Sequence, residues 1–378
     1  MKIIQVIPNL KKGGAERIVI DIVRTLVKRV NCKVKLILFE NHIEYNVDDI
    51  LNFIEIIPSS ATLSIVKKNR FRILELQKTI ELFQPDIIHT HLFESEIITR
   101  SCYYPMAQWF THSHDRMKSF NNLNLFNINS KINLTNYFEK LYLLKRYKKN
   151  GGTNFIAISQ NIQLFLKSVM PKDLQFVYLL QNSIDVQRFI KPIDLISNNE
   201  NSICNLVSIG RLDKNKNHQF LIHVVLELKK RKFPIHLTIV GEGEERISLE
   251  SQIVNLNLMD QITLKGLQDN VPEFLWMSDV YVHSALSEGF GLTLLEAMAA
   301  GLPVVTLDGG GNRDLIKNGR NGFIIEKENS KLFADKIIEV FNNSTISNYN
   351  TTFAMNFDIS TYVEKLIAFY TLSLNGNH

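Results

Sequence analysis

The feature that most constrains the fold is an alternation of short apolar, β-branched segments with longer amphipathic segments, which occurs as two successive series. Parallel strands covered by helices on both faces are short apolar runs, and the covering helices are amphipathic. Each series therefore predicts a doubly wound α/β domain. In the first half we expect strands at residues 2–7, 33–39, 86–91, 106–111, 155–158 and 176–181, and helices at 15–29, 68–83, 135–149 and 160–168. In the second half we expect strands at residues 203–210, 235–241, 261–265, 280–283, 303–306 and 322–325, and helices at 219–230, 244–254, 272–278, 292–300 and 331–342.

The length of 378 residues also favours two domains, because a single hydrophobic core seldom serves a chain of this size. The connecting segment is expected in residues 190–201, which contain Pro192 and a polar run. The predicted domains are residues 1–188 and 189–358, and a last helix at residues 359–374 is expected to rejoin the first domain. Asn-rich stretches at residues 121–133 and 342–350 are expected to be surface loops.

The charge is distributed unevenly between the two halves. Residues 1–190 carry 26 Lys and Arg against 16 Asp and Glu, whereas residues 191–378 carry 17 against 22. A basic half suits an anionic partner, either a phospholipid surface or a pyrophosphate-linked acceptor. The basic segments 67–72 and 140–149 also contain apolar residues, which is typical of a helix or loop at a membrane surface and equally of a solvated helix face. We expect no nucleic-acid partner, because the chain has no aromatic-basic RNA-binding motif and no helix-turn-helix pattern.

The cysteines and the apolar segments bear on the compartment. Cys32, Cys102 and Cys204 are far apart and make no metal-binding spacing, which favours a reducing compartment and no structural zinc. There is no signal-peptide pattern at the start and no apolar run of membrane-spanning length. We therefore expect a cytoplasmic protein, with at most peripheral contact to the inner face of the cell membrane.

The strongest local pattern is SEGFGLTLLEAMAAGLPVV at residues 287–305, which follows a predicted strand and continues into a predicted helix. Gly289 and Gly291 allow backbone amides to approach a ligand closely, and a helix N-terminus favours a phosphate. Glu288 precedes the helix and Glu296 lies within it, so the two carboxylates can bind the hydroxyls of one ligand at two points. The alternative is a glycine turn that caps a helix, with Glu288 as an ordinary acidic residue of the first turn.

Two cationic residues follow the first strand of the second series. Arg211 comes directly after Gly210 at the predicted strand end, and Lys216 comes just before the next helix. Both can neutralise a diphosphate that gains charge as it leaves. The alternative for Lys216 is a solvated surface lysine. No Asp-x-Asp pattern is present, so we expect no obligatory metal and no cofactor other than a co-substrate.

These patterns together resemble the family-four retaining glycosyltransferases of the GT-B fold. Residues 288–296 match the family's Glu-x7-Glu signature, and four further motifs occur in the family's order. These are the glycine loop at residues 13–17, the strand PDIIHTH at 85–91, the segment LQNSID with Phe189 at 180–189, and SIGR with Lys216 at 208–216. The resemblance covers nearly the whole chain and is most specific in residues 203–326. Two positions depart from the family pattern, Asp314 where Glu is usual and Ser183 where Gly is usual.

The resemblance implies two facing Rossmann-like domains with a cleft between them, and it implies roles for individual residues. The catalytic group is Glu288, His114, Arg211 and Lys216, with His114 preferred to His112 because it directly precedes an acid. Glu296 is expected to bind the ribose, Arg211 and Lys216 the diphosphate, and Gly266 and Leu267 the base through backbone atoms. The remaining donor-binding residues are Gly14, Gly210, Gly289, Phe290, Gly291 and Leu292, where Glu288 and the amides that follow it orient the sugar.

The predicted activity is transfer of a hexose or N-acetylhexosamine, with retention, from a nucleotide diphosphate sugar. UDP is the favoured nucleotide, and the acceptor is a polyprenyl-pyrophosphate-linked or other glycan of bacterial surface polysaccharide synthesis, such as O-antigen, capsule or exopolysaccharide. Two alternatives stay open. One is a non-hydrolysing sugar-nucleotide epimerase, and the other is a catalytically silent subunit that binds a sugar nucleotide.

Overall fold

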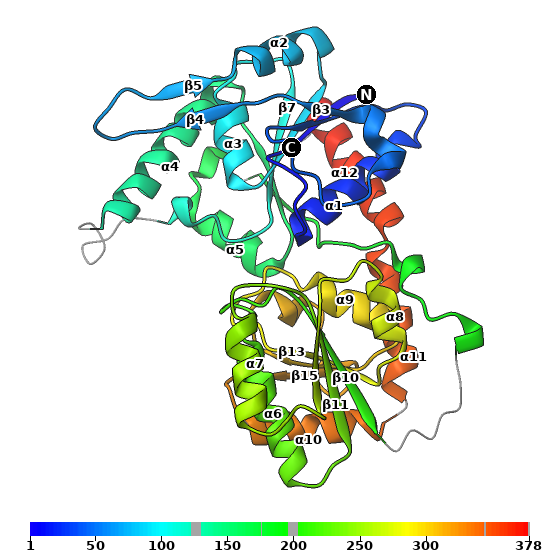
Figure 1. The fold of residues 1–378 in the computed structure, drawn as a ribbon. Coiled ribbons are helices and arrows are strands. Elements are labelled where there is room, and N and C mark those ends of the chain that lie inside the picture. Colours follow the sequence, from blue (N-terminus) through cyan, green and yellow to red (C-terminus); the bar gives the residue numbers. More distant parts are fainter. Residues whose placement is uncertain (122–129, 175, 196–202, 344, 377–378) are drawn as a thin grey trace. The chain divides into compact units, whose positions relative to one another are not determined.

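The computed structural model describes residues 1–121, 130–174, 176–195, 203–343 and 345–376. The chain divides into two compact units, which are described separately (Figure 1). The first consists of Met1–Asn182 and Ile359–His378, and the second of Ser183–Asp358. The expected boundary after residue 188 is six residues too late, because the Ile184 amide donates to the carbonyl of Phe357 and Arg188 donates to that of Asp269. Most of the expected connecting segment, residues 196–202, lies outside the described residues.

The first unit is built on a parallel sheet of seven strands in the order β3-β2-β1-β6-β7-β8-β9. Helices α1 and α12 pack on one face, and α2 and α3 pack on the other. The strands are β1 (Lys2–Ile7), β2 (Lys33–Leu38), β3 (Ile54–Ile56), β6 (Ile87–His91), β7 (Gln108–Ser113), β8 (Asn154–Ala157) and β9 (Val177–Leu179). The helices are α1 (Gly14–Val27), α2 (Leu74–Phe83), α3 (Phe93–Arg100), α4 (Lys131–Lys149), α5 (Gln160–Val169) and α12 (Ile359–Leu374).

The second unit is built on a parallel sheet of six strands in the order β12-β11-β10-β13-β14-β15. This is the Rossmann order, in which the chain winds outwards from the first strand and then reverses, and loops at that reversal bind ligands. The strands are β10 (Cys204–Ile209), β11 (Ile235–Val240), β12 (Ile262–Gly266), β13 (Val280–His283), β14 (Val304–Leu307) and β15 (Gly322–Ile325). The helices are α6 (His218–Lys230), α7 (Arg246–Asn255), α8 (Val271–Trp276), α9 (Leu292–Ala299), α10 (Ser330–Phe341) and α11 (Thr345–Ala354).

Several elements differ from the sequence expectation. Strand β3, helix α3 and the antiparallel hairpin of β4 (Ser60–Thr62) and β5 (Arg70–Arg72) were not expected. Helix α4 begins four residues early, where the Ser130 hydroxyl accepts the Asn133 amide. Within the Asn-rich stretch at 342–350, helix α11 replaces the expected loop, because the buried Asn350 amide donates to the carbonyls of Leu302 and Asn321. Of the other Asn-rich stretch, residues 122–129 lie outside the described residues.

Among the described helices, none combines the length and the apolar character that crossing a membrane requires.

Candidate functional site

The loops that follow β10 and β13 lie side by side because the two strands pair in parallel. The Leu286 amide donates to the Asn215 carbonyl at 2.8 Å, and the Asn215 amide side chain donates to the Ser287 carbonyl at 3.0 Å. The Ser284 hydroxyl donates to the carbonyl of Lys216 at 2.7 Å. These bonds bring two motifs that are 72 residues apart in the sequence into one site at the carboxyl edge of the sheet.

Glu288 is the centre of this site and has two side-chain partners. The Lys216 ammonium donates to its Oε2 at 2.7 Å, and Nε2 of His283 lies 3.2 Å from the same oxygen. Burial alone would raise the pKa of Glu288, but the bond from His283 and the charge of Lys216 outweigh it and lower the pKa to about 2. Glu288 is therefore an ionised hydrogen-bond acceptor at neutral pH.

A glycine loop after β14 holds the backbone of Glu288. The Glu288 amide donates to the Gly309 carbonyl at 2.7 Å, and the Gly311 amide donates to the Glu288 carbonyl at 2.9 Å. A Cβ at Gly311 would lie 2.5 Å from that carbonyl oxygen, so no larger residue fits without moving the loop. The motif GGGNRD, which ends at Asp314, thus places Glu288 by close backbone packing.

The N-terminus of α9 forms the next part of the site. Gly291 has φ 97°, in the left-handed region, and directly precedes the helix. The first amides of a helix have no acceptor within it, so those of Leu292 and Thr293 face outwards from this end. Phe290 was expected to contact the donor as one of the amides that follow Glu288. Its ring is 1% exposed and packs on Phe357, so only its backbone is available to a ligand.

Glu296 lies in the same helix and is half-buried. Its charge contributes, after the larger effect of burial, to a raised pKa of Tyr281, whose hydroxyl donates to the Ile209 carbonyl at 3.3 Å. Glu296 and Glu288 therefore both lie near Tyr281, whose hydroxyl reaches the end of β10.

Arg211 is placed at the rim of the site. Its side chain is 75% exposed and pairs with Asp213 at 3.2 Å. Among the described residues, Glu288 forms its ion pair with Lys216 and a hydrogen bond with His283, and Arg211 contacts it in neither way. Gly210 is in close contact with Gly241, where a Cβ would lie 1.9 Å from the Gly210 carbonyl oxygen.

Gly266 and Leu267, the residues expected to meet a base, follow at the end of β12. Gly266 has φ 71° and accepts the Gly241 amide at 2.9 Å, and Leu267 is exposed. The strand order therefore places Gly210, Gly241 and Gly266 at neighbouring strand ends of one sheet edge.

His283 is the site residue that the sequence reasoning missed. It ends the apolar strand β13 and is buried, five residues before Glu288. Burial lowers its pKa, against the opposing effect of the bond to Glu288. A polar residue at the end of an otherwise apolar strand was the available signal.

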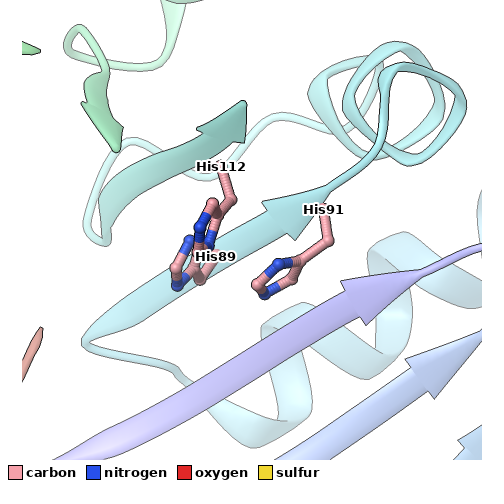
Figure 2. Close-up of side chains that lie close together, drawn as sticks. All are labelled: His89, His91 and His112. Atoms are coloured by element: carbon pink, nitrogen blue, oxygen red, sulfur yellow. The ribbon is translucent and has the colours of Figure 1, made fainter. Parts of the chain in front are cut away.

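The first unit carries the other two expected residues, Gly14 and His114. Gly14 is the first residue of α1, and the preceding Gly13 donates its amide to the Tyr45 hydroxyl at 3.0 Å. His114 directly follows β7, where it belongs to a group of four histidines with His89, His91 and His112 (the histidine cluster). Figure 2 shows the three that lie on β6 and β7.

The histidine cluster exists because strand side chains alternate between the two faces of a sheet. The registers of β1, β6 and β7 place Gln5, His89, His91 and His112 on the face that α12 covers. Helix α12 contributes Tyr370, whose hydroxyl lies 2.5 Å from Nδ1 of His89 and accepts the Gln5 amide at 3.0 Å. Burial lowers the pKa of all four histidines, that of His114 to about 3, so the rings are neutral at pH 7.

The cluster fits a network of neutral rings better than a metal centre. His89, His91 and His112 each offer a ring nitrogen within 4.8 Å of the others. However, both nitrogens of His91 have partners, because Nε2 lies 2.7 Å from Oε1 of Gln5 and Nδ1 lies 3.1 Å from Nε2 of His114. Two remaining rings are fewer than the three or four protein ligands of a typical zinc site.

Known proteins give an independent view of the chain. Residues 189–355 match the family model "Glycosyl transferases group 1". An N-acetylgalactosaminyltransferase of Campylobacter jejuni, named for the diphospho-undecaprenol-linked sugar it extends, is 27% identical over 345 residues, which cover 85% of each chain. The putative glycosyltransferase EpsD of Bacillus subtilis is 32% identical over 136 residues, and the matched region is 36% of the length of each. Anabaena Alr3699/HepE, solved with UDP and glucose, is similar in structure with a TM-score of 0.76 and 20% identity over 99% of each chain.

The family match confirms the predicted glycosyltransferase resemblance for the second unit, and the structural likeness confirms the predicted GT-B fold class. The residue roles rest on the geometry described above and on the family resemblance.

Proposed function

We propose that this chain, whose residues 189–355 form a glycosyl transferases group 1 domain, transfers a hexose or N-acetylhexosamine from a nucleotide diphosphate sugar to a lipid-linked glycan. The observation that carries the proposal is the ionised Glu288, held by Lys216 and His283 beside the N-terminus of α9. A fixed carboxylate next to free amides and cationic side chains suits a ligand that combines sugar hydroxyls with phosphates.

In the proposed complex the donor follows the carboxyl edge of the second sheet. Gly266 and Leu267 contact the base through backbone atoms, and Glu296 binds the ribose. Arg211 and Lys216 neutralise the diphosphate, for which the exposed guanidinium of Arg211 has room to turn. Glu288 and the amides at the start of α9 bind the sugar. UDP is the proposed nucleotide, supported by the UDP bound to Anabaena Alr3699/HepE.

The proposed chemistry is transfer with retention and without an enzyme nucleophile. The bond from the sugar C1 to the phosphate oxygen breaks, the acceptor oxygen bonds to C1 on the same face, and the departing phosphate takes the acceptor proton. No metal is proposed, because cationic side chains and a helix N-terminus can stabilise the leaving charge. His114 is proposed to contact the sugar, and Gly14 to face the phosphates and the acceptor. The acceptor proposal is supported by the name of the Campylobacter relative.

Donor binding is tested by a thermal-shift screen of UDP-, GDP- and ADP-sugars, since a ligand that binds only the folded state raises the melting temperature. Transfer is then measured with a polyprenyl-pyrophosphate-linked sugar, and product stereochemistry from the anomeric proton in NMR. We expect Glu288→Gln to lower transfer about a hundredfold or more, because it removes the charge that orients the sugar. The control Glu250→Gln changes an exposed carboxylate of α7 and should transfer as the wild type does.

The other readings predict different results. Conversion of the donor without acceptor would indicate an epimerase, and donor binding without turnover across a broad acceptor panel would indicate a silent subunit. Transfer at the wild-type rate by the Glu288→Gln variant would overturn the proposed site.

We further propose that the first unit binds an anionic membrane surface at the inner face of the cell. The support is a surface that joins the β4–β5 hairpin to α4, where the rings of Phe71 and Tyr142 stack at 5.9 Å. The segments that form it carry both exposed apolar side chains and exposed cations. The apolar residues are Val66, Phe71, Leu74 and Leu141, and the cations are Lys67, Lys68, Arg70, Arg72, Lys145, Lys148 and Lys149.

Two residues of the expected basic segment 140–149 do not belong to that surface. The buried Lys140 donates to the Phe120 carbonyl, and Arg146 donates to carbonyls at the end of α3. Both are therefore structural.

Vesicle sedimentation tests this surface. The variant Lys67→Gln/Lys68→Gln should bind phosphatidylglycerol vesicles about thirtyfold more weakly, at about 1 kcal/mol per charge. The control Lys230→Gln/Lys327→Gln lies in the second unit and should bind as the wild type does. Equal binding to neutral phosphatidylcholine vesicles, or no effect of salt, would contradict the electrostatic part of the proposal.

A further inference from the structure

His283 is buried, is the last residue of β13 and contacts Glu288, and the family signature at residues 288–296 does not include it. Its Nε2 and the Lys216 ammonium both approach Oε2 of Glu288. Among the described residues, no donor is assigned to the other oxygen, Oε1. One oxygen of the carboxylate is thus held by two side chains, and the other keeps its capacity to accept hydrogen bonds.

The protonation state of His283 follows from this contact. An ionised carboxylate only accepts hydrogen bonds, so His283 must carry its proton on Nε2 to bond with Glu288. Burial lowers the pKa of His283, which keeps the ring neutral at pH 7 and fixes a single tautomer. Unlike the flexible Lys216, His283 is 2% exposed and is held by the strand that carries it.

We propose that His283 is a positioning residue that holds Oε2 of Glu288, so that Oε1 accepts hydrogen bonds from hydroxyls of the donor sugar. This inference rests on the proposed function, because it assigns the sugar to Glu288. It adds that His283 affects recognition of the sugar and leaves recognition of the nucleotide diphosphate unchanged. It also predicts that donors which lack the hydroxyl facing Oε1 bind more weakly.

Three variants at this position separate positioning from packing. Gln can place its amide nitrogen where Nε2 of His lies, whereas the shorter Asn places it near Nδ1, and Leu offers no donor. We expect His283→Leu and His283→Asn to bind UDP-N-acetylglucosamine about ten- to a hundredfold more weakly in calorimetry, because a buried carboxylate loses a donor. Binding of UDP should stay at the wild-type value, and His283→Gln should restore most of the sugar-dependent affinity.

A double-mutant cycle tests whether His283 acts through Glu288. In the Glu288→Gln background, His283→Leu should cause no further loss. Independent losses that add up, or an equal loss for UDP, would overturn the proposal and indicate a packing role.

A measurement without ligand tests the contact between His283 and Glu288 independently of the proposed function. In protein labelled with ¹⁵N-histidine, the His283 resonance is identified by its loss in the His283→Asn variant. It should show a neutral ring protonated on Nε2 and should shift in the Glu288→Gln variant. A proton on Nδ1 would overturn the inference. A wild-type protein that binds neither UDP nor UDP-N-acetylglucosamine but keeps the NMR signature would contradict the proposed function and leave the contact between His283 and Glu288 intact.

Discussion

Mild acid should destabilise the first unit more than the second, because the four rings of its histidine cluster are buried in the neutral form, whereas the second unit buries two such histidines, His218 and His283. The folded-state pKa of each ring is lowered, that of His114 to about 3, whereas an unfolded histidine titrates near 6.5. Below pH 6.5 the unfolded chain therefore takes up protons that the folded unit does not. The free energy of unfolding then decreases as the pH is lowered, until the pH reaches the folded-state pKa. Between pH 7 and about pH 5.5 this amounts to about 1.2 kcal/mol per ring, or about 5 kcal/mol for the cluster. Carboxylates scarcely titrate in this window, so the effect belongs to the histidines.

Urea unfolding followed by tryptophan fluorescence measures this loss. In a Trp276→Phe background the remaining Trp109 is buried in the first unit and reports on that unit alone. The variant His112→Phe removes one titrating ring, so its loss between the two pH values should be smaller by about 1.2 kcal/mol. The control His42→Gln changes an exposed histidine and should follow the parent. A parent that loses less than about 1 kcal/mol, or an unchanged loss in His112→Phe, would refute the assignment of a neutral buried cluster.

Three further outcomes follow from the contacts in the two units. Gly311→Ala should abolish donor binding in calorimetry and lower the melting temperature, because its Cβ would lie 2.5 Å from the Glu288 carbonyl oxygen; unchanged donor affinity would contradict this. The Lys216 ammonium stabilises the charge of Glu288, so Lys216→Met should raise the pKa of Glu288. The acid limb of the pH–rate profile should then move to higher pH, and an unmoved limb would argue against that ion pair. Arg100→Met should cost about 3–5 kcal/mol in urea unfolding followed by circular dichroism, because it leaves the fully buried Glu96 without its cation; a loss below about 1 kcal/mol would be inconsistent with an ionised pair.

Much of the fold was predictable because parallel strands covered on both faces leave a strong apolar pattern. The clearest omission in the predicted secondary structure is α3, a helix that turns polar side chains to the interior. Its Glu96 and Arg100 form a fully buried ion pair, and Arg100 also lies over the ring of Trp109 at 4.5 Å. A helix that buries charge has no apolar stripe, so periodicity could not detect it. Helix α11 was not predicted for a related reason, because Asn350 is buried although asparagine is typical of loops.

The site was predictable as a set of residue types but not as an arrangement. Glu288 and Lys216 were each chosen for their local motif, yet their contact depends on the pairing of β10 with β13, which no local pattern specifies. The same limit applied to the choice between His112 and His114. The structure places His112 within β7, and His114 lies just past the strand end, bonded to His91.

In the proposed complex, the shared oxygen of Glu288 explains how one site binds both the phosphates and the sugar. Without a ligand, Lys216 and His283 both hold Oε2, and the pair of charges is nearly neutral. A diphosphate competes for Lys216, because it is the stronger anion and the lysine stem is flexible. Once Lys216 turns to the phosphates, His283 is the remaining side-chain donor to Glu288 among the described residues. In the proposed complex, a rigid, neutral donor on the strand therefore keeps the carboxylate directed at the sugar while the mobile cation binds the leaving group. A second lysine in place of His283 would itself be drawn to the phosphates.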